Sequence, residues 1–224
     1  ADRNEQSMRL AQAEAAARVA QLTMLRYQLN PHFLFNTLNA LQGLIASKRN
    51  DRAGNMISEL GHFLRYSLQS DPVQTVDLEQ EIEALKMYLN IEQARFGERL
   101  EVKVDYDPAI GSAQIPSMLL QPLVENAIKY AIGPSEEGGC IEINAMIENN
   151  SLVLTVSDNG PGLDDTDELP APSGTGVGLR NIRERLANSY GDGAAMYITN
   201  RVTGGLMVVI RLPYVASYLR AKAS

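Results

Sequence analysis

Residues 125–131 read ENAIKYA, residues 158–162 read DNGPG, and residues 174–179 read GTGVGL. The first string lies in an apolar segment with helical spacing, the second follows a strand-like segment, and the third precedes a helix-like one. Glycines before a helix let backbone N–H groups approach a phosphate, where the helix dipole adds positive potential. Taken alone, the glycines are compatible with phosphate binding and equally with ordinary turns.

Two common nucleotide-binding motifs do not account for these glycines. No G-x-x-x-x-G-K-[ST] string occurs, which excludes a P-loop. The run at residues 174–179 does not directly follow a strand, which disfavours a Rossmann dinucleotide site.

The string at residues 125–131 places a polar cluster on an otherwise apolar helix. Glu125 and Lys129 are four residues apart and share one face, as do Asn126 and Tyr130. A solvent-facing ion pair is the simpler interpretation of Glu125 and Lys129. An amide oxygen, a carboxylate and an ammonium group together suit a magnesium nucleotide, because Mg²⁺ prefers oxygen ligands and phosphates attract a cation.

Around these strings the pattern predicts helices packed on a mostly antiparallel sheet, an α+β arrangement. Asp77 is expected to cap a helix that Gly97 ends, and the residues between two strands at 148–150 predict a hairpin turn. The expected helices cover residues 77–96, 117–130 and 177–190, and the expected strands cover 100–106, 140–147, 151–157, 196–200 and 206–212.

The first part of the chain is predicted to be helical. Leu22, Leu25, Leu29 and Phe33 step by three or four residues, and a second stripe begins at Ile57 and ends at Leu68. Pro31 either kinks the first helix or opens a new one after Asn30. Two antiparallel helices joined near residues 47–51 bury little surface alone, so the hairpin is expected to pair with a second copy into a four-helix bundle.

The composition is that of an ordinary globular protein. The chain has 224 residues, 45% hydrophobic and 21% charged, with one cysteine and no apolar run long enough to span a membrane. The net charge is −7, with eight Lys/Arg against five Asp/Glu in residues 1–70 and twelve against twenty-two in residues 71–224. Because affinity for nucleic acid comes largely from basic side chains, direct nucleic-acid binding is not expected.

The three strings, in this order, resemble the N, G1 and G2 boxes of the GHKL superfamily, the ATP-binding fold shared by histidine kinases, gyrase, MutL and heat-shock chaperones. The segment LNPHFLFNTLN at residues 29–39 resembles the phosphoacceptor box of LytS/YehU-type sensor histidine kinases. MYLNIEQARFGERL at residues 87–100 is similar to the linker helix of that family. The resemblance covers roughly residues 25–213.

The resemblance implies a role for each residue that matches a motif. His32 is the phosphoacceptor nucleophile, and Asn126 holds Mg²⁺ through its amide oxygen. Glu125 orients or deprotonates near the γ-phosphate. Asn36, four residues after His32, is a candidate for dephosphorylating the regulator by analogy with other histidine-kinase subfamilies, and the alternative is a polar helix residue bonded to a backbone carbonyl near Pro31. The residues assigned to ATP are Asn126, Lys129, Tyr130, Asp158, which accepts a hydrogen bond from the adenine amino group, Gly160, Gly162, Gly174, Gly176, Gly178 and Leu179.

The sequence departs from related patterns at two positions. Phe33 follows His32, where many histidine kinases of other subfamilies carry an acidic residue, so the group that takes the imidazole proton is not assigned. Tyr130 stands where relatives often carry histidine, and either stacking or packing accounts for it. Residues 163–173 match the lid position and are acidic. His62 lacks the phosphoacceptor string and is interpreted as structural.

The resulting expectation is the kinase core of a two-component sensor that uses ATP and Mg²⁺. It comprises dimerisation and phosphotransfer helices (residues 1–71), an ATP-binding domain (72–214) and a C-terminal tail (215–224). The expected partners are a second copy and the receiver domain of a response regulator, with the LytTR type implied by the resemblance. The fragment is expected in the cytoplasm, with a sensor part or membrane anchor elsewhere in the parent protein.

Two alternatives stay open from the sequence. The first is a GHKL-type ATPase that drives conformational change without a phosphohistidine, although such proteins need a transducer domain after the ATP site. The second is a non-catalytic dimerisation scaffold with a decayed site. Glu125, Asn126, Asp158 and the glycines of the boxes are all present, which disfavours the scaffold.

Overall fold

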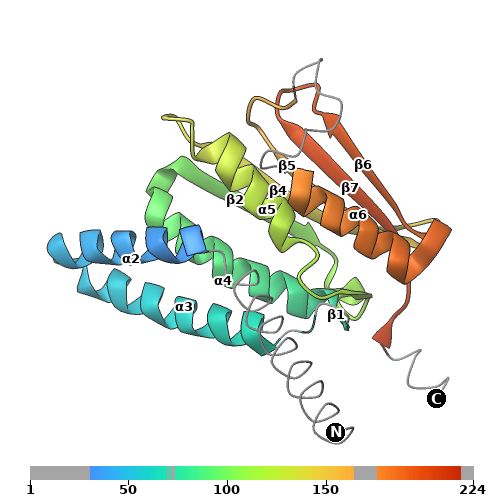
Figure 1. Cartoon of the computed structure of the whole chain (residues 1–224), viewed down its shortest axis with the longest axis horizontal. Coiled ribbons are helices and arrows are strands. Elements are labelled where there is room, and N and C mark those ends of the chain that lie inside the picture. Colours follow the sequence, from blue (N-terminus) through green and yellow to red (C-terminus); the bar gives the residue numbers. More distant parts are fainter. Residues whose placement is uncertain (1–30, 70, 72–73, 164–175, 218–224) are drawn as a thin grey trace, which may run out of the picture. The chain divides into compact units, whose positions relative to one another are not determined.

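The computed structural model describes residues 31–69, 71, 74–163 and 176–217, and the chain divides into two compact units, Ala1–Gln69 and Ser70–Ser224. In the first unit, α2 (Pro31–Ala46) and α3 (Asn50–Gln69) form a hairpin (Figure 1). The expected stripe before Pro31 lies outside the described residues, as does the choice between a kink and a new helix there.

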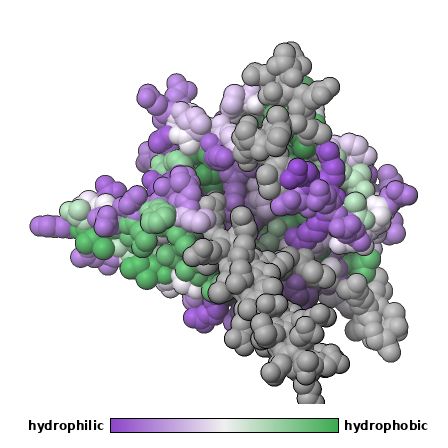
Figure 2. Space-filling view, viewed as in Figure 1, coloured by the Kyte–Doolittle hydropathy of each residue, from purple (hydrophilic) through white to green (hydrophobic). Residues whose placement is uncertain are grey.

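The two helices pack through aromatic rings near the open end of the hairpin. Phe33 of α2 meets Phe63 of α3 edge to face, with ring centroids 5.5 Å apart. Phe33 lies near the start of its helix and Phe63 near the end, so the helices run antiparallel as predicted. Other apolar side chains stay exposed and make a green area over this hairpin in Figure 2. They are Phe35, Leu38, Ile45, Ile57 and Leu68.

The second unit is a five-stranded sheet with helices on one face (Figure 1). Its strands lie in the order β2-β4-β5-β7-β6, with β2 and β4 parallel and every other pair antiparallel. The mixed, mostly antiparallel sheet of an α+β fold is therefore confirmed. The strands are β2 (Leu100–Tyr106), β4 (Gly139–Glu148), β5 (Ser151–Asp158), β6 (Ala195–Asn200) and β7 (Leu206–Pro213).

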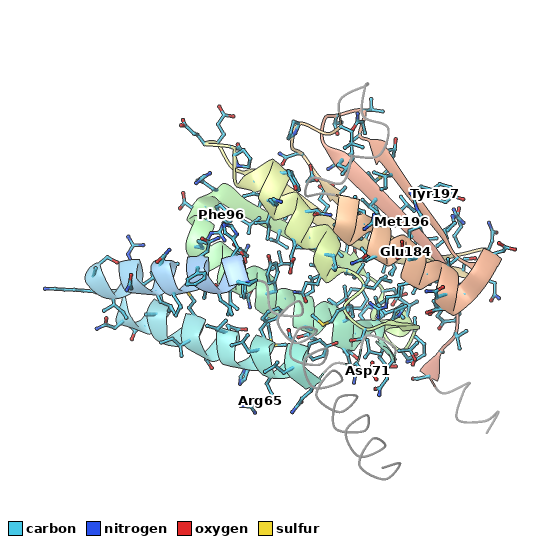
Figure 3. All side chains as sticks on the ribbon, in the orientation of Figure 1. Arg65, Asp71, Phe96, Glu184, Met196 and Tyr197 are labelled. Atoms are coloured by element: carbon cyan, nitrogen blue, oxygen red, sulfur yellow. The ribbon has the colours of Figure 1, made fainter. Side chains whose placement is uncertain are left out.

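The helices of the second unit are α4 (Leu78–Phe96), α5 (Gln121–Ala127) and α6 (Gly176–Tyr190). Asp77 is the N-cap of α4, where its backbone N–H donates to the Gln80 side chain at 3.3 Å, and Gly97 is the C-cap with φ of 63°. The turn between β4 and β5 is also confirmed, with Asn149 and Asn150 at positive φ. Side chains of all three helices fill the space against the sheet (Figure 3).

The prediction of one helix over residues 117–130 is wrong at both ends. The chain turns at residues 117–120, where Met118 has a φ of 55°, and α5 begins only at Gln121. After Ala127 the helix widens into one π-helical turn, η3 (Ile128–Ile132), closed by a bond from Gly133 N to Ile128 O of 2.8 Å. The apolar spacing of residues 118–120 reflects burial in a turn and not helix.

A small ladder that the sequence did not predict fixes the start of this unit. β1 (Thr75–Asp77) pairs antiparallel with β3 (Gln114–Pro116). The chain after β7 joins the same ladder, because Gln114 N donates to Val215 O at 2.7 Å and Ser217 N donates to Ser112 O at 2.9 Å. Residues 215–217 of the expected tail are therefore part of the second unit, and residues 218–224 lie outside the described residues.

Short helical turns complete the described elements. They are η1 (Gly97–Arg99), η2 (Pro108–Ile110) and η4 (Gly191–Gly193). Within the described part of the chain, no helix combines the length and the apolar character needed to cross a bilayer.

Candidate functional site

A cavity of about 280 Å³ opens in the second unit between α5, α6 and the sheet. Most of its lining is apolar, and the polar side chains among the lining residues are those of Asn126, Tyr130 and Asp158. The lining residues are Leu123, Asn126, Ala127, Tyr130, Ala131, Val156, Asp158, Pro161, Gly162, Leu163, Leu179, Leu206 and Val208. The cavity suits a flat, largely apolar ligand that also carries a hydrogen-bond donor.

Asp158 is a buried carboxylate, 7% exposed, at the last position of β5. Its Oδ1 accepts from Gly160 N at 2.9 Å and from Leu206 N at 3.2 Å. Among the described residues nothing donates to its Oδ2. Because Asp158 lines the cavity, this oxygen is available to a ligand N–H there.

Asn126 and Tyr130 come from the same helix and both line the cavity, as their spacing predicts. The amide nitrogen of Asn126 is buried, and no described residue accepts its hydrogen bond. The amide group is therefore not committed to an internal partner and can be used for a ligand.

Glu125 and Lys129 do not form the expected ion pair. Glu125 Oε1 accepts from Gln121 Nε2 at 2.8 Å, and Lys129 Nζ lies 4.7 Å from the centre of the Tyr130 ring. The π-helical turn begins at Ile128, between the two residues, so the α-helical spacing that would align them does not continue. Neither residue lines the cavity, although Lys129 is exposed beside it.

The structure explains why two positions of the second string, residues 160 and 162, require glycine. A Cβ on Gly160 would lie 2.4 Å from Ala131 Cβ, and Gly162 has a φ of 75°. Gly178 lies in the first turn of α6, where an added Cβ would only reach Pro122 at 3.9 Å. Gly176 begins α6, Leu179 lines the cavity, and Gly174 with residues 164–173 of the expected lid lies outside the described residues.

The turn between β6 and β7 is a part of the site that the sequence analysis missed. Leu206 N binds Asp158 Oδ1, and Arg201 Nη1 donates to Asp158 O at 3.2 Å. Asn200 pairs with both backbone groups of Leu163. A Cβ on Gly205 would lie 2.0 Å from Asp158 O, so only glycine allows this close approach. These residues lie about forty positions from Asp158, and no local string marks them.

His32 and Asn36 lie in the other unit, on α2, and share one face as expected. The amide nitrogen of Asn36 is 3.2 Å from Nδ1 and 3.3 Å from Nε2 of His32. His32 is exposed, whereas Phe33 beside it is buried against Phe63. The imidazole is thus accessible on a helix whose orientation is fixed by the next residue.

Near Glu125 of α5, α4 carries a polar cluster of Tyr88 and Glu92, which are buried, and Arg95, which is half-buried. Arg95 Nη1 lies 2.8 Å from Oε2 of Glu92, which is 2% exposed, and the Arg95 guanidinium stacks 4.1 Å from the Phe96 ring that Figure 3 labels. Burial raises the pKa of Glu92 from 4.5 to about 7, Arg95 opposes the rise, and Glu125 adds to it. Burial also raises the pKa of Tyr88 well above its ordinary value.

The described residues alone do not make a metal cage, since no three His, Cys, Asp or Glu side chains among them cluster as metal ligands. A Mg²⁺ ion does not require one, because it commonly takes one or two protein oxygens together with phosphates and waters. The uncommitted amide of Asn126 fits that kind of site.

Both units of the chain match known protein families. The family described as histidine kinase matches residues 20–100, and the family described as histidine kinase-, DNA gyrase B-, and HSP90-like ATPase matches residues 111–216. The chain is similar to the sensor protein LytS of Enterococcus faecalis, with 33% identity over 95% of this chain and 38% of that protein.

A second relative and a solved structure agree with this. The sensor histidine kinase YesM of Bacillus subtilis is 36% identical over 86% of this chain and 33% of its own length. The chain thus spans about a third of the length of these curated relatives. The catalytic domain of histidine kinase ThkA has the same fold, with a TM-score of 0.50 at 18% identity, over 62% of this chain and 93% of that domain.

The buried Glu92 carboxyl predicts a pH dependence of stability. The folded chain holds this proton more tightly than the unfolded chain, since its pKa rises from 4.5 to about 7, so stability falls as the pH rises through that range. The Glu92→Gln variant has no such proton. Between pH 6 and pH 8, the free energy of unfolding of the parent should fall relative to Glu92→Gln by about 1 kcal/mol.

Urea unfolding at the two pH values measures this difference. The matched control is Glu98→Gln, because Glu98 is exposed at the end of the same segment, and it should follow the parent at both pH values. If the free energy of unfolding changes equally between pH 6 and pH 8 in the parent and in Glu92→Gln, Glu92 is already ionised at pH 6 in the folded chain.

Proposed function

This chain belongs to the histidine kinase family, and we propose that it is the kinase core of a two-component sensor. It binds Mg·ATP in the second unit, phosphorylates its own His32 and passes the phosphoryl group to an aspartate of a response regulator. The observation that carries the proposal is the Asp158 carboxylate, buried in an apolar cavity with one oxygen held by backbone N–H groups and the other left for a ligand.

A purine base suits this cavity. Apolar side chains from α5, β5, β7 and α6 offer both ring faces a nonpolar surface, and Asp158 Oδ2 accepts from an exocyclic amino group. Adenine has an amino group at this edge and guanine has a carbonyl oxygen, so a carboxylate favours adenine. Tyr130 lines the same cavity and adds an aromatic wall.

The phosphates extend toward the start of α6. Gly176 and Gly178 lie in its first turn, where free backbone N–H groups and the helix dipole favour an anion. Lys129 is exposed beside Tyr130, which lines the cavity, and offsets phosphate charge. Asn126 holds Mg²⁺ through its amide oxygen, and the metal ion neutralises charge on the transferred phosphate.

His32 is the phosphoacceptor. One imidazole nitrogen forms a bond with the γ-phosphorus, the bond from that phosphorus to the bridging oxygen breaks, and ADP leaves with the electron pair. The ring proton passes to a base, for which the Glu125 carboxylate is the candidate. The amide of Asn36 lies within hydrogen-bond distance of the imidazole.

The partners follow from the same proposal. The apolar side chains exposed on α2 and α3 are covered by the same hairpin of a second copy, which gives a homodimer with a four-helix bundle. The receiver domain of a response regulator, of the LytTR type, takes the phosphoryl group from His32. The reaction takes place in the cytoplasm, and sensor and membrane parts belong to the remainder of a longer protein.

Replacing the acceptor tests the proposal directly. His32→Gln is expected to abolish labelling of the chain by γ-labelled ATP, while the affinity for nucleotide stays within about twofold because the cavity lies in the other unit. His62→Gln is the matched control, since His62 is the other histidine and is also exposed, and it should label normally.

The outcome for the parent chain separates the alternatives. Alkali-stable, acid-labile label on the protein supports the kinase, whereas release of phosphate without protein label indicates an ATPase that lacks a phosphohistidine. Neither label nor release indicates a scaffold. Label that persists in His32→Gln would show that the acceptor is another residue.

Asn126→Ala tests the metal role. This variant should lose most of the Mg²⁺-dependent part of ATP binding, a weakening of about tenfold or more, because no neighbouring side chain offers an amide oxygen at that position. Calorimetry with and without Mg²⁺ measures it, and Asn126→Asp, which keeps an oxygen ligand, should retain the Mg²⁺ dependence. Asp158→Ala is the contrasting variant, because it should weaken binding with or without Mg²⁺. Unchanged Mg·ATP affinity in Asn126→Ala would exclude the metal role.

Asn36→Ala tests whether the residue beside His32 also acts on the regulator. His32 labelling should persist within about threefold, whereas loss of phosphate from the regulator should slow by about tenfold, the scale expected of a group that orients a water. Gln42→Ala is the control, because Gln42 is an exposed amide of the same helix that lies six residues from Asn36 and so on a different face. If labelling itself disappears, Asn36 serves to orient the imidazole, and an unchanged dephosphorylation rate would leave it without a role in that step.

A further inference from the structure

Asn200, the last residue of β6, binds the backbone of a residue that lines the cavity. Its side-chain Oδ1 accepts from Leu163 N at 2.7 Å, and its Nδ2 donates to Leu163 O at 2.7 Å. A single amide thus satisfies both backbone groups of Leu163, as one residue of an antiparallel partner strand would. The contact joins positions 37 residues apart in the sequence.

The same amide also packs against the residue before Leu163. Gly162 has a φ of 75°, and a Cβ added to it would lie 2.6 Å from Asn200 Oδ1. Gly162 and Leu163 both line the cavity. Asn200 therefore contacts two consecutive residues of one cavity wall without lining the cavity itself.

The other end of this wall is held separately. Asp158 is bonded by Leu206 N, Gly160 N and Arg201, all of which act at the carboxylate or at its own carbonyl. Pro161 and Gly162 lie between the two anchors. Without the Asn200 contact, the described bonds that still tie this segment to the sheet are those at Asp158 and at Asn159, whose Oδ1 accepts from Cys140 N of β4 at 2.7 Å.

We propose that Asn200 is a positioning residue for the nucleotide. It holds the wall formed by Pro161, Gly162 and Leu163 at the base-binding end of the cavity and thereby sets the affinity for adenine nucleotides. This inference rests on the proposed ATP binding and adds to it a residue that touches neither the base nor the phosphates.

Only an amide of this length meets both demands. Aspartate keeps an acceptor for Leu163 N but places a second oxygen against Leu163 O, where no hydrogen remains to bond. Alanine removes both bonds. Because Asn200 is exposed, water satisfies the freed backbone groups, so the folded state loses little while the wall loses its fixed position.

The experiment compares Asn200→Ala and Asn200→Asp with Asn188→Ala and Asn188→Asp. Asn188 is exposed on α6 in the same unit, so these controls match the changes in size and charge. Calorimetry gives the Kd for ATP and ADP, the rate of His32 labelling gives KM and kcat, and thermal unfolding gives Tm. All measurements use the full chain.

Both Asn200 variants should weaken ATP and ADP binding equally, by about fivefold to tenfold, the scale of two exposed hydrogen bonds. KM for ATP should rise by the same factor with kcat unchanged, because the wall contacts the base in the ground state and the transition state alike. Tm should stay within about 2 °C of the parent, as for any surface change, and the Asn188 variants should bind normally.

A double-mutant comparison of ATP affinity tests the role of Asn200 in a second way that does not depend on a single variant. Gly162→Ala pushes a methyl group against Asn200 Oδ1, so it should weaken binding more in the parent than in the Asn200→Ala background. The backbone strain at this φ is present in both backgrounds and cancels in the comparison. Additive effects would mean that the amide does not act through Gly162.

The results that overturn the inference differ from those that overturn the proposed function. If the parent binds ATP and the Asn200 variants bind within twofold of it, Asn200 has no positioning role. A fall in kcat at unchanged KM overturns it as well. If the parent itself binds no ATP, the proposed function is wrong.

Discussion

A buried carboxylate at Glu81 joins the three helices that cover the sheet. It is 2% exposed, and its two oxygens accept from Met118 N at 2.7 Å and from Leu120 N at 3.0 Å. Burial raises the pKa of Glu81, whereas these backbone donors and Arg185 lower it. Arg185 of α6 donates to Ser117 O at 2.5 Å, so α4, the turn before α5, and α6 meet at one point. The positions of Asn126, on α5, and Leu179, on α6, depend on this junction.

Asp158, like Glu81, is a buried carboxylate that accepts hydrogen bonds from backbone N–H groups, but the two differ in how many oxygens are used. Glu81 uses both oxygens for backbone donors and is therefore structural, whereas Asp158 uses Oδ1 alone and keeps Oδ2 for a ligand. The strand register creates this arrangement. Ser157 pairs with Met207, which brings Leu206 N beside the carboxylate at the end of β5. A shift of one residue in that register would turn the carboxylate to the other face of the sheet.

The sequence predicts those parts of the site whose residues lie close together along the chain, and it misses those that only strand pairing brings together. The strings at 125–131 and 158–162 are local, and they identified Asn126, Tyr130, Asp158 and Gly162 as residues that line one cavity. Asn200, Arg201 and Leu206 were missed because their partners lie 37 to 48 residues away and only the pairing of β5 with β7 and of β7 with β6 brings them close. The α5 boundary failed for a related reason, since Glu81 holds the turn at 117–120 from a distant helix.

The π-helical turn after α5 explains why the motif at residues 87–100 accompanies the one at 125–131. A π turn leaves carbonyl groups at its end without the usual helical donors, and π turns are rare and often found at functional sites. Arg99 supplies donors to this end: its Nη2 bonds Ser135 O and lies 3.5 Å from the carbonyl oxygens of Ile132 and Gly133. Arg99 reaches that end because α4 stops at Phe96 and η1 turns the chain back toward β2. The linker-like segment and the Asn126 helix are therefore one structure, in which a guanidinium stabilises the widened turn that carries Lys129 and Tyr130.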